Sequence, residues 1–384
     1  MSSQARSQQI VFSLTSHGLG HLTRSLAVAG ELRRLYPGAG LTVATTVPEA
    51  RVALDLSPPF AYRSVAYEPG TLQRNCFELD LAATRAAYRR FLAERDERLR
   101  GEVHFLRQAG ATAVVSDVPA LPIRAAAELR LPAVGLANFT WDWILEPLLA
   151  GSDEDFVPDL LASDYARGLA HLRLPFGPDT SPFPISEPAP LVSRRARLDA
   201  PELRRRLGIP DDGAALVVVC PGGWDPVAWS PIHAAGCEGF RFLVVGDLPV
   251  TADAPLLSLT HDLSAGIGFP DLVAAAEAVL AKPGYGIASE CVAHRTALVS
   301  IERPDFRETP LLVEQLRGLG PSATLSLADF FAGRWEDTLR AALASEVPWA
   351  PIPADGTRRV AERLGELLGL ESDGRPSPAS GGGR

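Results

Sequence analysis

The chain has 384 residues, of which 46% are hydrophobic and 22% charged, a composition typical of a globular protein with two cores. Its net charge of −9 argues against a nucleic-acid-binding surface. The four cysteines form no CxxC pair, and we find no signal peptide and no apolar run of about 20 residues. We therefore expect a cytoplasmic protein without membrane contact; the sequence does not indicate its oligomeric state.

The first part of the chain alternates apolar runs with helical periodicity. Short apolar runs predict strands, and the spacing of leucine and alanine predicts helices. The strands are at 10–14, 41–45, 113–116 and 133–136, and the helices are at 22–35, 81–108 and 121–129. Strands that alternate with helices are typical of a parallel, doubly wound sheet. We expect one Rossmann-like domain over residues 10–173, after a disordered lead-in at 1–9.

The pattern resumes after a proline-rich stretch. Residues 174–190 contain six prolines, so we predict a linker over 174–200. The strands that follow are predicted at 215–220, 240–245, 278–281 and 297–301, with helices at 203–207, 271–276 and 287–293. The predicted fold class is therefore α/β, with a second Rossmann-like domain over 201–370 facing the first across a crevice. The low-complexity tail, 371–384, is expected to be disordered.

A glycine turn, SHGLGH, follows the first predicted strand. It has two glycines rather than the three of GxGxxG, which argues against a nicotinamide or flavin enzyme. His17 and His21 flank the turn, and a neutral imidazole can take a proton from a hydroxyl. The alternative is that these histidines pack against the turn or cap it. Asp117 ends another strand and either orients a histidine or caps the next helix.

Polar and aromatic residues end a further strand of the same domain. The segment NFTWDW carries Asn138, Trp141 and Asp142, which suit a sugar or another polar acceptor. Equally, Trp141 closes the core. Together with Gly18, Gly20 and Arg24, these residues form the predicted acceptor side.

The stretch AVLAKPGYGIASE, residues 278–290, contains the only lysine, Lys282. Its strand, glycine turn and helix direct unpaired N–H groups at a ligand, which favours anions. Gly284 and Gly286 let a ligand approach the backbone. Ser289 and Glu290 are predicted in the first helical turn, where the carboxylate accepts a sugar hydroxyl. The alternative is an ordinary β–α turn.

Other residues of the second domain are candidates for the same site. Gly222 and Gly223 follow a strand and present backbone N–H groups to a diphosphate. Phe269 contacts a base or packs in the core, and Arg303 adds a guanidinium for phosphates. No cluster of histidine, cysteine or carboxylate has the spacing of metal ligands, so we predict no metal site.

Three segments carry a resemblance to a known family: TSHGLGHLTRSLAVAGEL, VVSDVPALPIRAAAELRLPAVGLANFTWDWI and AKPGYGIASECVAHRTALVSIERPDFRETPLL. They resemble the two-domain (GT-B) glycosyltransferases of the family 28 type and, more closely, the glycosyltransferase-like N-terminal half of plant L-arabinokinases. This resemblance implies a UDP-sugar bound by the second domain and an acceptor bound by the first. It implies no cofactor beyond that co-substrate.

The resemblance also implies roles for individual residues. His21 corresponds to the glycine-loop histidine, a base or acceptor contact, and Glu290 to the ribose-binding glutamate. Phe269 lies near the base-contacting position, and Gly222 and Gly223 match the diphosphate loop. The expected activity is inverting, metal-independent transfer of a hexosyl or pentosyl group to a hydroxyl of a small molecule or glycan. The alternatives are a nucleotide-sugar epimerase and a catalytically silent nucleotide-sugar-binding module.

Overall fold

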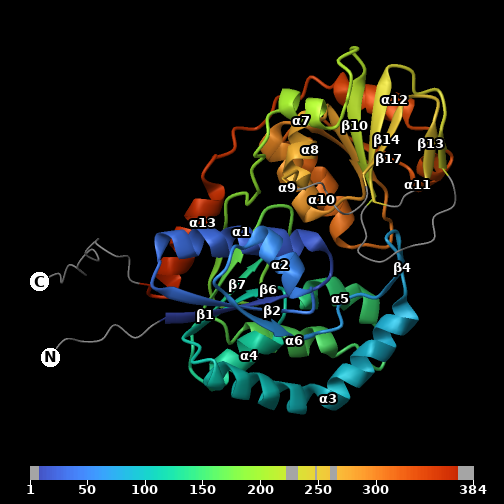
Figure 1. Cartoon of the computed structure of the whole chain (residues 1–384). Helices are drawn as coiled ribbons and strands as arrows, with labels where there is room; N and C mark the ends of the chain where they lie inside the picture. The colour runs from blue at the N-terminus through green and yellow to red at the C-terminus, as the bar shows by residue number, and fades with distance from the viewer. Residues whose placement is uncertain (1–7, 222–231, 247–248, 260–265, 371–384) are drawn as a thin grey trace, which may run out of the picture.

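The computed structural model describes residues 8–221, 232–246, 249–259 and 266–370. Within these ranges the chain forms two parallel sheets flanked by helices, which confirms the predicted α/β fold of two Rossmann-like domains. Figure 1 shows the two sheets in separate lobes, with the N-terminal domain below the C-terminal domain. The predicted disordered tail, residues 1–7 of the predicted lead-in, Gly222 and Gly223 lie outside the described residues.

The N-terminal sheet has the strand order β3-β2-β1-β6-β7-β8-β9. Its strands are β1 (Gln8–Leu14), β2 (Ala39–Thr45), β3 (Ala61–Ser64), β6 (Ala113–Asp117), β7 (Ala133–Ala137), β8 (Ala170–Arg173) and β9 (Ser186–Pro188). The central strands are buried because helices cover both faces, which explains their continuous apolar runs. The register pairs Leu14 with Asp117, so the glycine turn after β1 lies beside the end of β6.

Helices cover the two faces of this sheet. They are α1 (Leu19–Leu35), α2 (Glu49–Asp55), α3 (Leu81–Gln108), α4 (Leu121–Glu128), α5 (Trp141–Leu149) and α6 (Val157–Tyr165). Residues of α1 share one apolar cluster with the strands, and residues of α3, α4 and α6 share another on the opposite face. Figure 1 shows this division, with α1 above the sheet and α3, α4 and α6 below it.

The C-terminal sheet has the strand order β14-β12-β10-β15-β16-β17, and a short parallel pair accompanies it. The strands are β10 (Ala215–Cys220), β11 (Ile232–Ala234), β12 (Phe240–Val245), β13 (Val250–Ala252), β14 (Leu256–Leu259), β15 (Ala278–Ala281), β16 (Ala297–Ile301) and β17 (Ser322–Leu325). The helices are α7 (Ala200–Arg206), α8 (Phe269–Ala275), α9 (Tyr285–His294), α10 (Glu308–Arg317), α11 (Leu327–Phe331) and α12 (Glu336–Leu343). Helix α9 connects the neighbouring strands β15 and β16.

Two segments cross from one domain to the other. The last helix, α13 (Gly356–Leu367), packs on α1 and buries Val360 and Leu364 in the N-terminal domain. The hairpin of β4 (Gln73–Asn75) and β5 (Glu78–Leu79) buries Phe77 in the core of the C-terminal domain. The domains are therefore joined by packing as well as by the connection before α7, as Figure 1 shows.

One helix begins earlier than the sequence predicts. Gly284, with an extended backbone (φ −141°, ψ 142°), caps α9, so the helix starts at Tyr285 rather than at residue 287. The prediction that Ser289 and Glu290 lie in the first turn is therefore wrong, because both fall in the second. No helix within the described ranges is long and apolar enough to cross a bilayer.

Candidate active site

The centre of the candidate site is Asp117, the buried last residue of β6. Its carboxylate accepts hydrogen bonds from three side chains of α1. Oδ1 lies 2.9 Å from His21 Nδ1 and 2.7 Å from Arg24 Nη2, while Oδ2 lies 3.1 Å from Arg24 Nε and 2.6 Å from Ser25 Oγ. A buried carboxylate is tolerated only when it is paired and hydrogen-bonded in this way.

Local backbone geometry places these groups. Gly18 caps α1 with φ 100°, a conformation that side-chain-bearing residues rarely adopt, so His21 falls in the first turn. Asp117 does not cap the next helix, because Glu68 Oε1 accepts the N–H groups of Ala120 and Leu121 at 3.0 and 2.7 Å. Of the two roles considered for Asp117, the structure places it against the histidine.

The contacts of His21 indicate which ring nitrogen carries the proton. An ionised carboxylate only accepts, so we assign the proton of neutral His21 to Nδ1, facing Asp117. Arg24 Nη2 also lies 2.7 Å from Nδ1, but it has a better acceptor in Asp117. The Nε2 lone pair is then available to accept a proton.

Burial and neighbouring charge both act on these groups. Burial, then Arg24, lowers the pKa of His21, while Asp117 opposes the shift. Burial alone would raise the pKa of Asp117, but Arg24 and His21 lower it to about 2. The pair is therefore a neutral imidazole on an ionised carboxylate at neutral pH.

The second histidine of the turn is in a different environment. His17 Nδ1 lies 2.9 Å from Thr15 Oγ1, and its ring meets Trp141 edge-on with centroids 5.1 Å apart. Burial and His21 lower the pKa of His17 to about 4. A Cβ at Gly70 would come within 2.3 Å of the His17 ring, so this position requires glycine. His17 has no carboxylate partner such as His21 has among the described residues.

The predicted acceptor residues surround this pair. Asn138 Oδ1 accepts a hydrogen bond from Arg24, which is thereby committed to two acceptors and is not free to bind phosphate. Trp141 is buried, and burial raises the pKa of Asp142. Trp141 Nε1 and Asp142 Oδ1 make no hydrogen bond within the described part of the chain, so they are available to a polar ligand.

The two glycine turns touch each other at the domain interface. A Cβ on Gly286 would lie 3.0 Å from Gly20 Cα, and a Cβ on Gly20 would lie 3.3 Å from Gly286 N. Glycine is thus needed here for close approach rather than for a left-handed backbone. The contact brings Tyr285 into the N-terminal domain, where its ring lies 6.4 Å from that of His21 and 5.7 Å from that of Phe139.

Beside Tyr285 lies a cluster of charged groups that includes Lys282. Arg303 is buried, donates from Nε to Cys76 O at 2.7 Å and lies 3.9 Å from Glu308 Oε1. Burial lowers the pKa of Lys282 to about 8 and that of Arg303 to about 10, and it raises the pKa of Glu308. The cluster combines two cations and one carboxylate in a largely water-excluded place.

Several polar atoms of this cluster have no partner within the described ranges. Arg303 Nη2, Tyr285 Oη and Thr309 Oγ1 are buried and make no hydrogen bond there, and Lys282 makes neither a hydrogen bond nor an ion pair there. Sequence reasoning did not single out Tyr285 or Thr309 as site residues. Their signal is position, because each follows the carboxyl end of a parallel strand, where open α/β sheets bind ligands.

The remaining predicted donor residues lie on α8 and α9. Glu290 is buried and accepts a hydrogen bond from Arg194 Nε at 2.7 Å, and Ser289 is buried next to it in the chain. Phe269 begins α8 and packs against the apolar core. The roles predicted for these three residues stay predictions.

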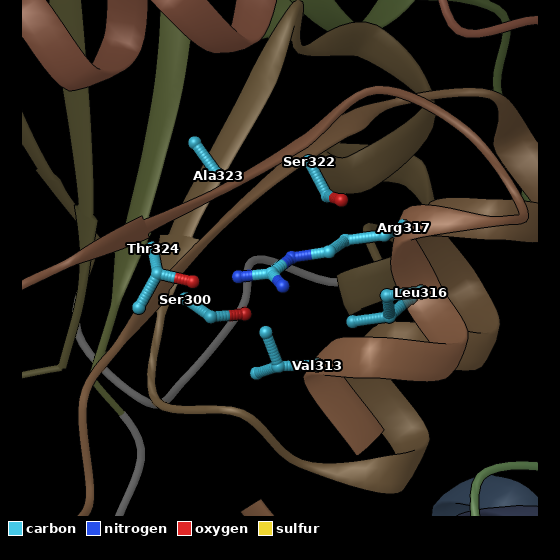
Figure 2. A pocket seen from close by; sticks show the side chains of 7 residues that line it. All are labelled: Ser300, Val313, Leu316, Arg317, Ser322, Ala323 and Thr324. Carbon is cyan, nitrogen blue, oxygen red and sulfur yellow. The ribbon is translucent and has the colours of Figure 1, made fainter. Parts of the chain in front are cut away.

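A cavity of about 290 Å³ lies elsewhere in the C-terminal domain, between α10, β16 and β17. Figure 2 shows Arg317 extending into it towards the hydroxyls of Ser300 and Thr324. It lies at the end of α10 opposite Glu308 and contains none of the predicted site residues. Among the described residues, no group of three or more His, Cys, Asp or Glu side chains is placed to hold a metal ion.

Two Rossmann-like α/β domains that face each other form the GT-B fold of the two-domain glycosyltransferases, and the chain has this fold. Its sequence is 30% identical over 347 residues to L-arabinokinase of Arabidopsis thaliana. The match covers 88% of this chain but only 33% of that relative, so the chain spans about a third of its length. No family model matches the chain.

Solved structures support the fold. The glycotransferase of kitacinnamycin superposes with a TM-score of 0.63 at 14% identity, over 94% of this chain and 100% of the other. A UDP-glucosyltransferase from Polygonum tinctorium gives 0.58 at 14% identity, over 96% and 100%. MurG of Acinetobacter baumannii gives 0.54 at 14% identity, over 94% and 99%. Because these identities are low, the likeness establishes the fold and not the reaction.

Proposed function

We propose that the chain is a glycosyltransferase that moves a hexosyl or pentosyl group from a UDP-sugar to a hydroxyl acceptor, with inversion and without a metal or cofactor. The observation that carries the proposal is the His21–Asp117 pair, at the point where the two domains touch. A neutral imidazole fixed by a buried carboxylate is suited to general-base catalysis. The acceptor is a small molecule or a glycan.

On the acceptor side, His21 Nε2 takes the hydroxyl proton as the acceptor oxygen bonds to the anomeric carbon. Asp117 holds the ring in the tautomer that leaves Nε2 unprotonated, and it stabilises the imidazolium that forms. Trp141 Nε1 and Asp142 Oδ1 are available to orient the acceptor. His17 is the alternative base, but the pairing with a carboxylate favours His21.

On the donor side, the bond from the anomeric carbon to the diphosphate oxygen breaks, and its electron pair leaves with UDP. Lys282 and Arg303 meet that charge, aided by the N-terminus of α9 at Tyr285 and Gly286. The N-termini of α1 and α9 approach each other at Gly20 and Gly286, and neither helix has an acidic residue in its first turn. Two unneutralised positive helix ends repel each other, and an anion between them relieves that repulsion.

The choice of UDP-sugar rests on the resemblance to family 28 and on the similar fold of the UDP-glucosyltransferase from Polygonum tinctorium. Glu290 is proposed to accept a ribose hydroxyl, and Phe269 to contact the base. Gly222, Gly223 and Gly284 are proposed to offer backbone N–H groups to the diphosphate. A glutamate carboxylate can accept a hydrogen bond from a hydroxyl, and glycine allows a ligand to come close to the backbone N–H.

A panel of UDP-sugars, each incubated with and without candidate acceptors, tests the proposal. We expect UDP release that depends on an acceptor and disappears in His21→Ala. Interconversion of the sugar without an acceptor would instead identify an epimerase, and binding with neither reaction would identify a silent module. The absence of any thermal shift with uridine nucleotides would refute the donor assignment, since a bound ligand stabilises the folded state.

A further inference from the structure

Arg194 joins three parts of the molecule through one side chain. It lies in the connection between the two domains, and its Nε donates to Glu290 Oε1 on α9 at 2.7 Å. Its Nη1 donates to Asp55 Oδ1, at the end of α2 in the N-terminal domain, at 3.1 Å. Arg51 holds the other oxygen of Asp55 at 2.6 Å. Glu290 is therefore tied, through a single guanidinium, to an anchored carboxylate of the other domain.

The hydrogen bonds of Glu290 are divided between its two oxygens. Oε1 accepts from Arg194, whereas Oε2 accepts nothing within the residues that the structure describes. The carboxyl group is buried, so it pairs with a cation or takes up a proton. One oxygen thus fixes the side chain, and the other is available to a ligand.

The charges around Glu290 come from three elements. Arg194 faces it from the connection, and Asp55 faces it from α2. His294, on α9 itself, lies with Nδ1 2.8 Å from Glu290 O and with Nε2 3.1 Å from Ala196 N. The Ala196 N–H donates to Nε2 of His294, which links α9 to the connection between the domains. Burial raises the pKa of Glu290, and Arg194 is the main opposing influence.

We propose that Arg194 is a positioning residue, which holds the Glu290 carboxylate in place for a hydroxyl of the donor nucleotide. The inference rests on the proposed function, in which Glu290 binds the ribose. Arginine is required because its planar fork reaches Glu290 and Asp55 together, whereas the single ammonium of lysine does not. Without Arg194, Glu290 protonates at a higher pH and no longer accepts in the same way.

Calorimetric titration with UDP at pH 5.5 and pH 7.5 tests this role, in the full-length chain. In Arg194→Gln we expect at least about a tenfold loss of affinity relative to wild type at pH 5.5, because a charge-assisted hydrogen bond is lost, and a smaller loss at pH 7.5. Taking the ratio to wild type cancels the titration of UDP itself. Arg194→Lys keeps the charge and should show little of the pH dependence.

Arg195→Gln is the matched control. Arg195 is the next residue, is exposed and, within the described ranges, donates only to Ala354 O, so its loss should leave UDP affinity unchanged at both pH values. The double variant Arg194→Gln/Glu290→Gln tests the route of the effect. If Arg194 acts through Glu290, the double variant binds UDP as weakly as Glu290→Gln and no more weakly.

The results separate this inference from the proposed function. Wild-type protein that binds UDP, with Arg194→Gln equal to it at both pH values, overturns the role of Arg194 alone. The role of Arg194 is also overturned if the double variant binds UDP more weakly than Glu290→Gln by the full factor measured for Arg194→Gln. Wild-type protein that binds no uridine nucleotide refutes the proposed function, and this inference falls with it.

Discussion

Replacing Asp117 by asparagine tests the proposed catalytic pair directly. The substitution keeps the shape of the side chain but removes its charge and one acceptor. In one orientation the amide N–H₂ faces Ser25 and Arg24, and in the other it faces His21. All three side chains donate hydrogen bonds to the wild-type carboxylate. If the amide donates to Nδ1, the imidazole proton moves to Nε2, which is the wrong tautomer for a base. We expect kcat to fall by about 10²–10⁴-fold, the usual contribution of a general base.

The same substitution has a cost in stability that the pKa of Asp117 allows us to estimate. The pKa falls from 3.8 to about 2, and the lowered pKa corresponds to about 2–3 kcal/mol. A lowered carboxyl pKa contributes stability above the unfolded value, so this contribution is lost as pH falls from about 4 to about 2. The neutral amide also leaves Arg24 short of a charged partner, which brings the expected loss to about 3–5 kcal/mol.

Turnover is therefore measured well below the melting temperature of the variant, with UDP affinity measured by calorimetry on the same preparation. We expect UDP affinity to be retained, because Asp117 lies on the acceptor side. Asp159→Asn, an exposed position on α6, is the matched control and should leave kcat unchanged. A folded Asp117→Asn protein with kcat within about threefold of wild type would refute the assignment of His21 and Asp117 as the catalytic pair.

Three further predictions concern pH, charge and contact. Because burial lowers the pKa of His21 below 6.5, the base should stay active at pH 6.5, and an acid limb of kcat/KM centred at 6.5 or higher would contradict this. UDP affinity should fall as pH rises through about 8, because Lys282 then loses its proton. Calorimetry on Lys282→Met should show about tenfold weaker binding at pH 7 and no such dependence on pH. In Gly286→Ala the new Cβ lies 3.0 Å from backbone, so assays should show turnover lowered by at least about tenfold. The control is Gly101→Ala on α3, where the new Cβ meets open space. It should raise stability by about 0.5–1 kcal/mol and leave turnover intact.

The elements that the sequence predicts correctly are those that depend on local patterns. Strands at the centre of a parallel sheet are apolar on both faces, so runs such as those of β10 and β15 are visible in the sequence. The helix predicted at 81–108 has the same bounds in the structure, because its periodicity is long and regular. The glycine turns directly follow the carboxyl ends of such strands, which is where open α/β sheets bind ligands, so the apolar runs also indicate where the turns lie.

What the sequence does not reveal depends on contacts between distant residues. The strand β9 lies within the stretch predicted as a linker, because six prolines obscure a three-residue edge strand. Helix α13 packs on α1 in the other domain, although it follows the C-terminal sheet in the chain. The hairpin of β4 and β5 carries no strong turn signal. Cys76 O in this hairpin accepts a hydrogen bond from Arg303, which lies 227 positions later in the chain.

The candidate site shows the same division. The types and approximate positions of His21, Asp117 and Glu290 follow from the sequence and its resemblance, and a histidine is one of the two partners considered for Asp117, but the partner of Glu290 does not follow. The sequence predicts Glu290 in a first helical turn, where a helix dipole would act on it, and the structure moves it to the second. Its neighbour in space is instead Arg194, which no spacing rule connects to it.

The cations at the domain interface give the lone lysine a clearer meaning. Arg24 is used by Asp117 and Asn138, Arg194 by Glu290 and Asp55, and Arg307 by Trp143 and Glu146. Each guanidinium bridges two acceptors, and Arg24 and Arg194 do so through different nitrogens of the planar fork. Lys282 makes no such bond within the described residues, and its titratable neighbours include Arg303, Cys76, Cys220 and Glu308. A compact ammonium is better suited to a mobile phosphate than to a fixed bridge. We therefore expect Lys282 to stabilise the charge of the leaving diphosphate more than the arginines that are already engaged.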